Sequence, residues 1–217
     1  MTELRLPEQW GWCLDGCRHA FADALQRSCP AGTFRYLEIG LGHGETCAAV
    51  VNLLVQLKGK DWQAIGLDLE RDPFKVRQTA GMVWRGHYRG ELVGTLKPDV
   101  NGVYIVMCDL DRAMANQLND CRFNTVFIDA CHCQECSEHD FLCIEDKVEP
   151  AGCVIFHDAS PLCQNANPQT FHERRLIGVR ATLEKLGLLN NARPGWTKIH
   201  DLTAVTFGAT IFQKDNL

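Results

Sequence analysis

The sequence lacks the features that would direct it to a membrane, to nucleic acid or into the secretory pathway. No apolar run approaches the roughly 20 residues of a membrane-spanning helix, and the opening segment MTELRLPEQW has no apolar stretch typical of a secretory signal. Lysine and arginine total 22 against 27 acidic residues, a net charge of −5, whereas nucleic-acid binding needs clustered positive charge. We therefore expect a cytoplasmic protein that binds neither membrane nor nucleic acid.

Internal repeats, low-complexity tracts and linkers are also lacking, so 217 residues fit one ordinary domain, or one with a short extension. Cysteine, by contrast, is abundant, with 12 residues. Without a secretory signal, these cysteines are expected to be reduced thiols, and most lie in apolar runs where a thiol behaves as a small hydrophobe. The oligomeric state is left open, with a homodimer as one alternative.

Strand-like and helix-like segments alternate along most of the chain. This order predicts an α/β fold, a doubly wound parallel sheet with helices on both faces. The predicted strands are 34–40, 62–70, 103–110, 124–130 and 153–159, with closing strands at 197–202 and 204–214; the predicted helices are 7–28, 44–59, 111–120, 137–148 and 173–187.

Acidic residues recur where the predicted parallel strands end. In such a sheet the ligand binds at the carboxyl ends of the strands, near the switch in strand order. Aspartate is common in turns, so one or two would be unremarkable. Five acidic ends on one edge indicate a ligand rich in hydroxyl, amino or cationic groups. The residues at these ends are Glu38 with Gly40, Asp68, Asp109, Asp129, and His157 with Asp158.

The segment Glu38-Ile-Gly-Leu-Gly-His-Gly44 is a glycine loop between the first strand and a helix. Its glycines are spaced G-x-G-x-G, and Glu45 stands where a dinucleotide site has its third glycine. The carboxylate of Glu38 suits an ammonium group better than a pyrophosphate. Asp68 follows at about the 20-residue offset of a ribose-binding acid. These features disfavour a nicotinamide-dependent Rossmann enzyme, which is kept as an alternative.

The glycine loop and the acids that end the second and third strands resemble those of class I S-adenosylmethionine-dependent methyltransferases. The segments FIDACHCQE and CVIFHDA are most similar to the small-molecule O-methyltransferase branches, with departures at Ala130, Cys133, Gln134 and Ala151. The resemblance covers residues 34–217 and implies a Rossmann-like, seven-stranded, mostly parallel sheet with an antiparallel closing strand. Residues 1–33 are then expected to be an N-terminal helical extension.

This resemblance implies S-adenosyl-L-methionine as cofactor and a hydroxyl group of a small molecule as methyl acceptor. Glu38 would face the methionyl ammonium, Asp68 the ribose hydroxyls and Asp109 the adenine amino group. The backbone of the glycines would pass beneath the cofactor; they are Gly40, Gly42 and Gly44. A relative that binds the cofactor without catalysis is the alternative.

An acceptor hydroxyl must lose its proton, and two mechanisms are left open. Asp129 and Asp158, with His157, are hypothesised to hold Mg²⁺ or another divalent cation, which would relieve the repulsion between the carboxylates. Metal-dependent relatives have asparagine where this chain has Ala159. In the metal-free alternative, His132 or His157 is the base, with Asp129 beside it. The rate of methyl transfer would then rise as the pH increases through about 6.5.

The run Cys131-His-Cys133-x-x-Cys136 resembles a zinc cluster. Structural zinc usually takes ligands from two separated segments of the chain. Adjacent ligands at the start of a helix are expected to point in divergent directions. The sequence interpretation is therefore that these are ordinary, partly buried thiols.

Overall fold

The computed structural model describes residues 4–6, 16–42, 44–68, 102–106, 108–161, 178–202 and 208–216. Within these ranges the predicted alternation of strands and helices is confirmed. In chain order the elements are α1 (Arg18–Arg27), β1 (Phe34–Ile39), α2 (Glu45–Lys58), β2 (Trp62–Leu67), β3 (Gly102–Val106), α4 (Leu110–Asn116), β4 (Phe123–Ile128), α5 (Gln134–Ile144), the short 3₁₀ helix η1 (Glu145–Lys147), β5 (Val148–His157), α7 (Gly178–Lys185), β6 (Trp196–Asp201) and β7 (Ala209–Lys214).

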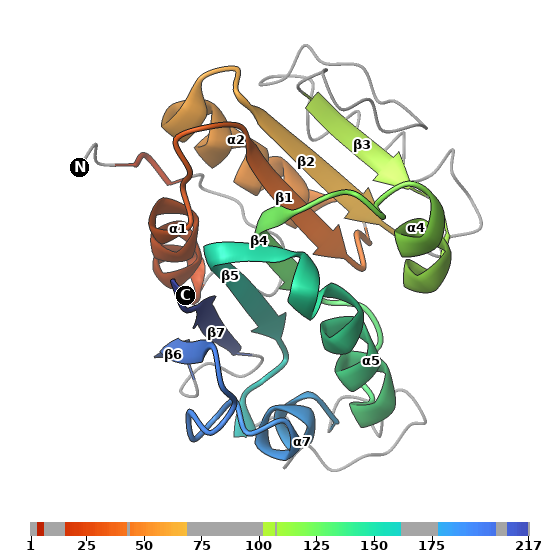
Figure 1. The fold of residues 1–217 in the computed structure, drawn as a ribbon. Coiled ribbons are helices and arrows are strands. Elements are labelled where there is room, and N and C mark those ends of the chain that lie inside the picture. The colour runs from red at the N-terminus through yellow and green to blue at the C-terminus, as the bar shows by residue number, and fades with distance from the viewer. Residues whose placement is uncertain are drawn as a thin grey trace.

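The strands form one seven-stranded sheet in the order β3-β2-β1-β4-β5-β7-β6 (Figure 1). Strands β1 to β5 pair in parallel, and β7 runs antiparallel to both β5 and β6. The strand order reverses between β1 and β4, which is where an open α/β sheet places its ligand. The predicted mostly parallel sheet with an antiparallel closing strand is therefore confirmed.

Two hydrophobic clusters lie on opposite faces of the sheet. Helices α1 and α2 cover one face, where Phe34 and Tyr36 of β1 point, and α4, α5 and α7 cover the other, where Leu37 and Ile39 point. This division follows from the two-residue period of a strand. Among the described residues, no helix combines the length and the hydrophobicity of a membrane span.

Several element boundaries differ from those predicted. Helix α1 begins at Arg18, with Gly16 and Cys17 in a turn, and residues 7–15 of the predicted helix lie outside the described residues. Helix α5 begins at Gln134, earlier than predicted, because the side chain of Cys133 caps its first turn. Residues 173–177 and 204–207 of the predicted elements also lie outside the described part. The boundary predicted between residues 33 and 34 stays a prediction.

Two further expectations about the strands were wrong. The fifth strand was expected to begin at residue 153, after a turn at Pro150–Gly152, but β5 begins at Val148 and includes this segment. A register shift between β4 and β5 and a positive φ of 60° at Ala151 accommodate these residues within the strand. Asp109 does not end a strand, because β3 stops at Val106 and Asp109 is the N-cap of α4.

The carboxyl ends of β1 and β4 approach each other closely at Gly40. The amide of Asp129 donates to the Ile39 carbonyl over 2.9 Å, and Gly40 has a φ of 89°. A Cβ atom on Gly40 would lie 2.3 Å from the backbone oxygen of Asp129. Position 40 therefore requires glycine both for its backbone conformation and for space.

We predict that Gly40→Ala lowers the free energy of unfolding by about 3 kcal/mol or more, the combined cost of a left-handed backbone and overpacking. Gly42→Ala is the matched control, since Gly42 has a φ of 52° but nothing within 4 Å of its added Cβ. It should cost only about 1–2 kcal/mol. Urea denaturation of both variants measures the difference, and equal losses would contradict the close approach.

Candidate active site

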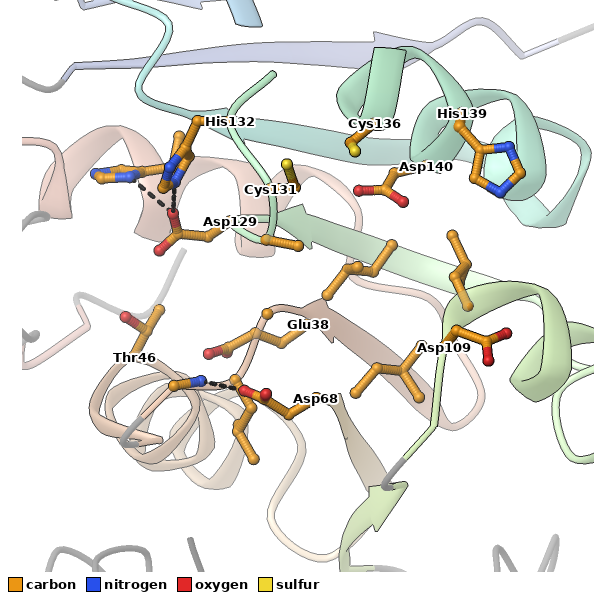
Figure 2. Close-up of a pocket in the computed structure, with 18 of the residues that line it drawn as sticks. Glu38, Thr46, Asp68, Asp109, Asp129, Cys131, His132, Cys136, His139 and Asp140 are labelled. Carbon is orange, nitrogen blue, oxygen red and sulfur yellow. Dashed lines mark hydrogen bonds and ion pairs between the residues drawn. The ribbon is translucent and has the colours of Figure 1, made fainter. Parts of the chain in front are cut away.

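A cleft of about 1180 Å³ lies at the carboxyl ends of the central strands (Figure 2). Typical small-molecule sites occupy about 300–1,000 Å³, so the cleft has room for a cofactor-sized ligand and a second molecule. All ten residues proposed from the sequence line it: Glu38, Gly40, Gly42, Gly44, Asp68, Asp109, Asp129, His132, His157 and Asp158.

The glycine loop is tied to the end of β2 at the floor of the cleft. The amide of Gly42 donates to Oδ2 of Asp68 over 2.6 Å, which Figure 2 shows as a dashed line. Gly44 has a φ of 76° and precedes the first residue of α2, Glu45. This hydrogen bond fixes the Asp68 carboxylate against the loop.

Glu38 is a buried carboxylate, with 1% of its surface exposed, and lines the cleft. Burial raises its pKa well above the usual range, and the charges of Asp129 and Asp68 add to this, although the Tyr36 hydroxyl donates to Glu38 over 2.7 Å. A cationic ligand group at Glu38 would favour its ionised form. Tyr36 was missed in the sequence, although its position two residues earlier in the strand places it on the same face.

Asp109 lines the cleft on the side away from Asp129 and His132 (Figure 2). Its Oδ1 accepts the Arg112 amide over 2.8 Å as the N-cap of α4, while the residue lines the cleft. Figure 2 shows Asp68 and Asp109 on different walls. The cap fixes the position of this carboxylate at the cleft.

Four residues at the other end of the cleft form what we call the Asp–His cluster: Asp129, His132, His157 and Asp158. Nε2 of His132 lies 2.8 Å from Oδ2 of Asp158 and 3.3 Å from Oδ1 of Asp129. Nδ1 of His157 lies 3.0 Å from Oδ1 of Asp129 and 3.4 Å from Oδ2 of Asp158. Each carboxylate therefore contacts both imidazoles.

Charges in the Asp–His cluster compensate one another. Burial lowers the pKa of His132, but hydrogen bonds with Asp129 and Asp158 outweigh this effect and raise it to about 9. Burial raises the pKa of Asp158, but hydrogen bonds with His132 and His157 hold it well below its usual range. Asp129 shows the same balance, with its pKa lowered. The expectation of a histidine pKa near 6.5 is therefore wrong for His132.

The histidines offer a second means of relieving the repulsion between Asp129 and Asp158. From the sequence, only a divalent cation was expected to relieve it. Ala159 is buried at 1% exposure and offers no ligand atom in its side chain. Four ligand atoms from the Asp–His cluster nevertheless lie within 4.8 Å of one another, so their spacing also fits a metal ion.

The thiols of Cys131, Cys133 and Cys136 converge, with all three sulfur atoms within 4.8 Å of one another. The expectation that they would point in divergent directions was wrong. Cys131 lies in the loop after β4, and Cys133 is the N-cap of α5. The first turn of α5 then brings Cys136 back towards both. The hydrogen bond with Cys133 and burial raise the pKa of the Cys136 thiol.

Asp140 is a cleft residue that sequence reasoning missed. It is 8% exposed, and burial raises its pKa to about 6. It follows Cys136 by four residues on α5 and therefore lies on the same face of that helix. The signal was an acidic residue one helical turn beyond the cysteine run.

Comparisons with known proteins find one matching family model and several similar folds. A family model described as a methyltransferase domain matches residues 37–159. The fold is similar to an O-methyltransferase from Bacillus cereus solved in complex with SAH, at 15% identity over 97% of this chain and 84% of that one, with a TM-score of 0.62. It is also similar to the O-methyltransferase TomG from Streptomyces achromogenes in complex with SAM, at 17% identity over 96% and 83% of the chains and a TM-score of 0.59. Comparison with curated proteins finds no match.

We predict that His132 titrates near pH 9 in the folded protein and that Asp158→Asn lowers this pKa by roughly one pH unit or more. Charged His132 thus stabilises the fold below pH 6.5, and this stabilisation is lost as the pH rises through about 9. NMR of the imidazole protons measures both values. Asp111→Asn is the control, because Asp111 pairs with exposed His139 instead. An unchanged pKa in Asp158→Asn would contradict the pairing.

Proposed function

Because the chain belongs to the methyltransferase domain family, we propose that it transfers a methyl group from S-adenosyl-L-methionine to a hydroxyl group of a small molecule. One observation carries the proposal. The glycine loop and its carboxylates line the same cleft as the Asp–His cluster. A methyl donor bound at the loop and a proton acceptor in the cluster can therefore both reach the same methyl-acceptor molecule.

The proposed cofactor roles follow from charge and position. Glu38, buried beside the glycine loop, pairs with the methionyl ammonium, and this cation offsets the cost of its ionisation. Asp68 accepts from the two ribose hydroxyls, and Asp109 from the adenine amino group. Neighbouring folds were solved with SAH and with SAM, which supports this choice of cofactor. Glu45, at the start of α2, disfavours the pyrophosphate of a nicotinamide cofactor.

The proposed reaction joins the acceptor oxygen to the methyl carbon. The carbon–sulfur bond breaks with its electron pair left on sulfur, so the sulfonium becomes the thioether S-adenosylhomocysteine. The acceptor proton passes to the Asp–His cluster. Both histidines contact Oδ1 of Asp129, and Figure 2 shows the other carboxylate oxygen of Asp129 pointing away from His132. We propose that this oxygen orients the acceptor hydroxyl and that an imidazole takes the proton.

A divalent cation at Asp129 and Asp158 stays a second proposal. Two carboxylates and two imidazoles within 4.8 Å are a donor set that fits an ion such as Mn²⁺ better than Mg²⁺, which prefers oxygen ligands. When bound, the ion would lower the pKa of the acceptor oxygen. We favour the metal-free form, because His132 and His157 already contact both carboxylates.

Composition supports further proposals about the compartment and the class of acceptor. Ten described cysteines are thiols, which supports a reducing compartment such as the cytoplasm. The net charge of −5 disfavours nucleic acid as acceptor. A homodimer and the division into an extension, 1–33, and a catalytic domain, 34–217, stay predictions. A non-catalytic relative is the alternative, and a panel of phenols, sugars and amines tests it by methyl transfer.

We predict that S-adenosylhomocysteine binds and NAD does not, and that Asp68→Ala weakens binding by roughly 1.5–3 kcal/mol, since hydrogen bonds to a charged group are lost. Calorimetry with both ligands measures this. Asp120→Ala, an exposed aspartate in the turn before β4, is the control and should bind normally. Tight NAD binding without a response to S-adenosylhomocysteine would reject the cofactor assignment.

We predict that methyl transfer, once the panel identifies an acceptor, persists in a chelator and that His132→Gln lowers kcat by about 10²–10⁴-fold with little loss of cofactor affinity. Only neutral His132 accepts a proton, so activity should rise with pH towards about 9. His19→Gln is the control, because His19 is exposed on α1 and does not line the cleft. Activity that is lost in the chelator and restored by Mn²⁺ or Mg²⁺ would instead establish the metal-dependent form.

A further inference from the structure

We propose that Cys131, Cys133 and Cys136 form a three-thiolate binding site for Zn²⁺ on the wall of the cleft. The site shares no ligand with the Asp–His cluster. It does not depend on the proposed methyl transfer, because it is defined by sulfur positions alone. Thiolate ligands select soft or borderline ions such as Zn²⁺ over Mg²⁺ or Ca²⁺.

The spacing of the sulfur atoms supports a single bound ion. All three lie within 4.8 Å of one another, and Sγ of Cys131 lies 3.4 Å from Sγ of Cys133. A tetrahedral zinc with Zn–S bonds of about 2.3 Å holds its sulfurs roughly 3.8 Å apart. Changes of about 1 Å or less in the sulfur–sulfur distances therefore suffice to place three thiolates around one ion.

The backbone around the three thiols is held by the rest of the fold. Sγ of Cys133 accepts the amide of Cys136 over 3.4 Å, which fixes the first turn of α5. The amide of Gly178, at the start of α7, donates to the His132 carbonyl over 3.2 Å. A Cβ on Gly178 would lie 2.0 Å from the amide nitrogen of Gln134, so α7 packs directly on this segment. The ligand geometry is thus largely formed before an ion binds.

The position of the thiols leaves one side of the ion towards the cleft. Cys131 and Cys136 line it, as does the buried carboxylate of Asp140 (Figure 2). Three protein ligands and one position open to water or a ligand are the arrangement of non-structural zinc sites. Because two of the ligands flank His132, a bound ion would also hold the segment that carries this histidine.

The test uses the full chain, reduced and stripped of metal, titrated with Co²⁺ and then Zn²⁺. We expect a thiolate-to-cobalt charge-transfer absorption that Zn²⁺ abolishes by displacement. Cys131→Ser, Cys133→Ser and Cys136→Ser should each weaken Zn²⁺ binding by roughly 10-fold or more, since even a group that only supports a ligand costs this much. Serine at 133 keeps an N-cap acceptor for α5, so this variant separates the thiolate from helix stability.

The control Cys121→Ser, a half-buried thiol in the turn before β4, should bind Zn²⁺ like the parent protein. Absence of the charge-transfer absorption in the parent protein would overturn the proposal whether or not the variants fold. So would an ion that the three serine variants retain and Asp158→Asn loses, because that ion would belong to the Asp–His cluster.

Discussion

The approach of β1 to β4 at Gly40 is the constraint on which the rest of the cleft depends. Only a residue without Cβ fits there, since the backbone oxygen of Asp129 would lie 2.3 Å from that atom. The contact brings the glycine loop, which follows β1, against Asp129, which follows β4. The proposed cofactor on the loop and the proposed reacting group beside Asp129 would thereby share one cleft, at the point where the strand order reverses.

Negative charge is the second organising feature of the cleft. The carboxylates at the glycine loop and those in the Asp–His cluster have different partners. At the glycine loop, buried Glu38 accepts from the neutral Tyr36 hydroxyl and lies near the charges of Asp68 and Asp129. At the other end, His132 and His157 contact both Asp129 and Asp158. The first arrangement suits a cationic ligand, and the second can accept a proton without creating an isolated buried charge.

The parts of the site that local sequence rules govern were predictable. Glycine spacing, acids near the strand ends and the alternation of elements depend on residues close in the chain. Together with the resemblance to methyltransferases, these patterns indicated the fold and ten residues that line the cleft. Two errors arose where one local rule overrode another. Asp109 caps a helix rather than ending a strand, and Ala151 lies inside β5 because a register shift accommodates it.

Sequence by itself determined the sheet type, the position of the ligand edge and the chemical character of the cleft. Only the tertiary structure decided how side chains from different strands pair. His132 follows β4 and Asp158 follows β5, so their 2.8 Å contact, and the pKa of about 9 that it helps produce, depend on the spacing of two strands. The convergence of Cys131 with Cys136 likewise depends on the turn into α5. Distances and burial set these interactions, and neither follows from local residue order.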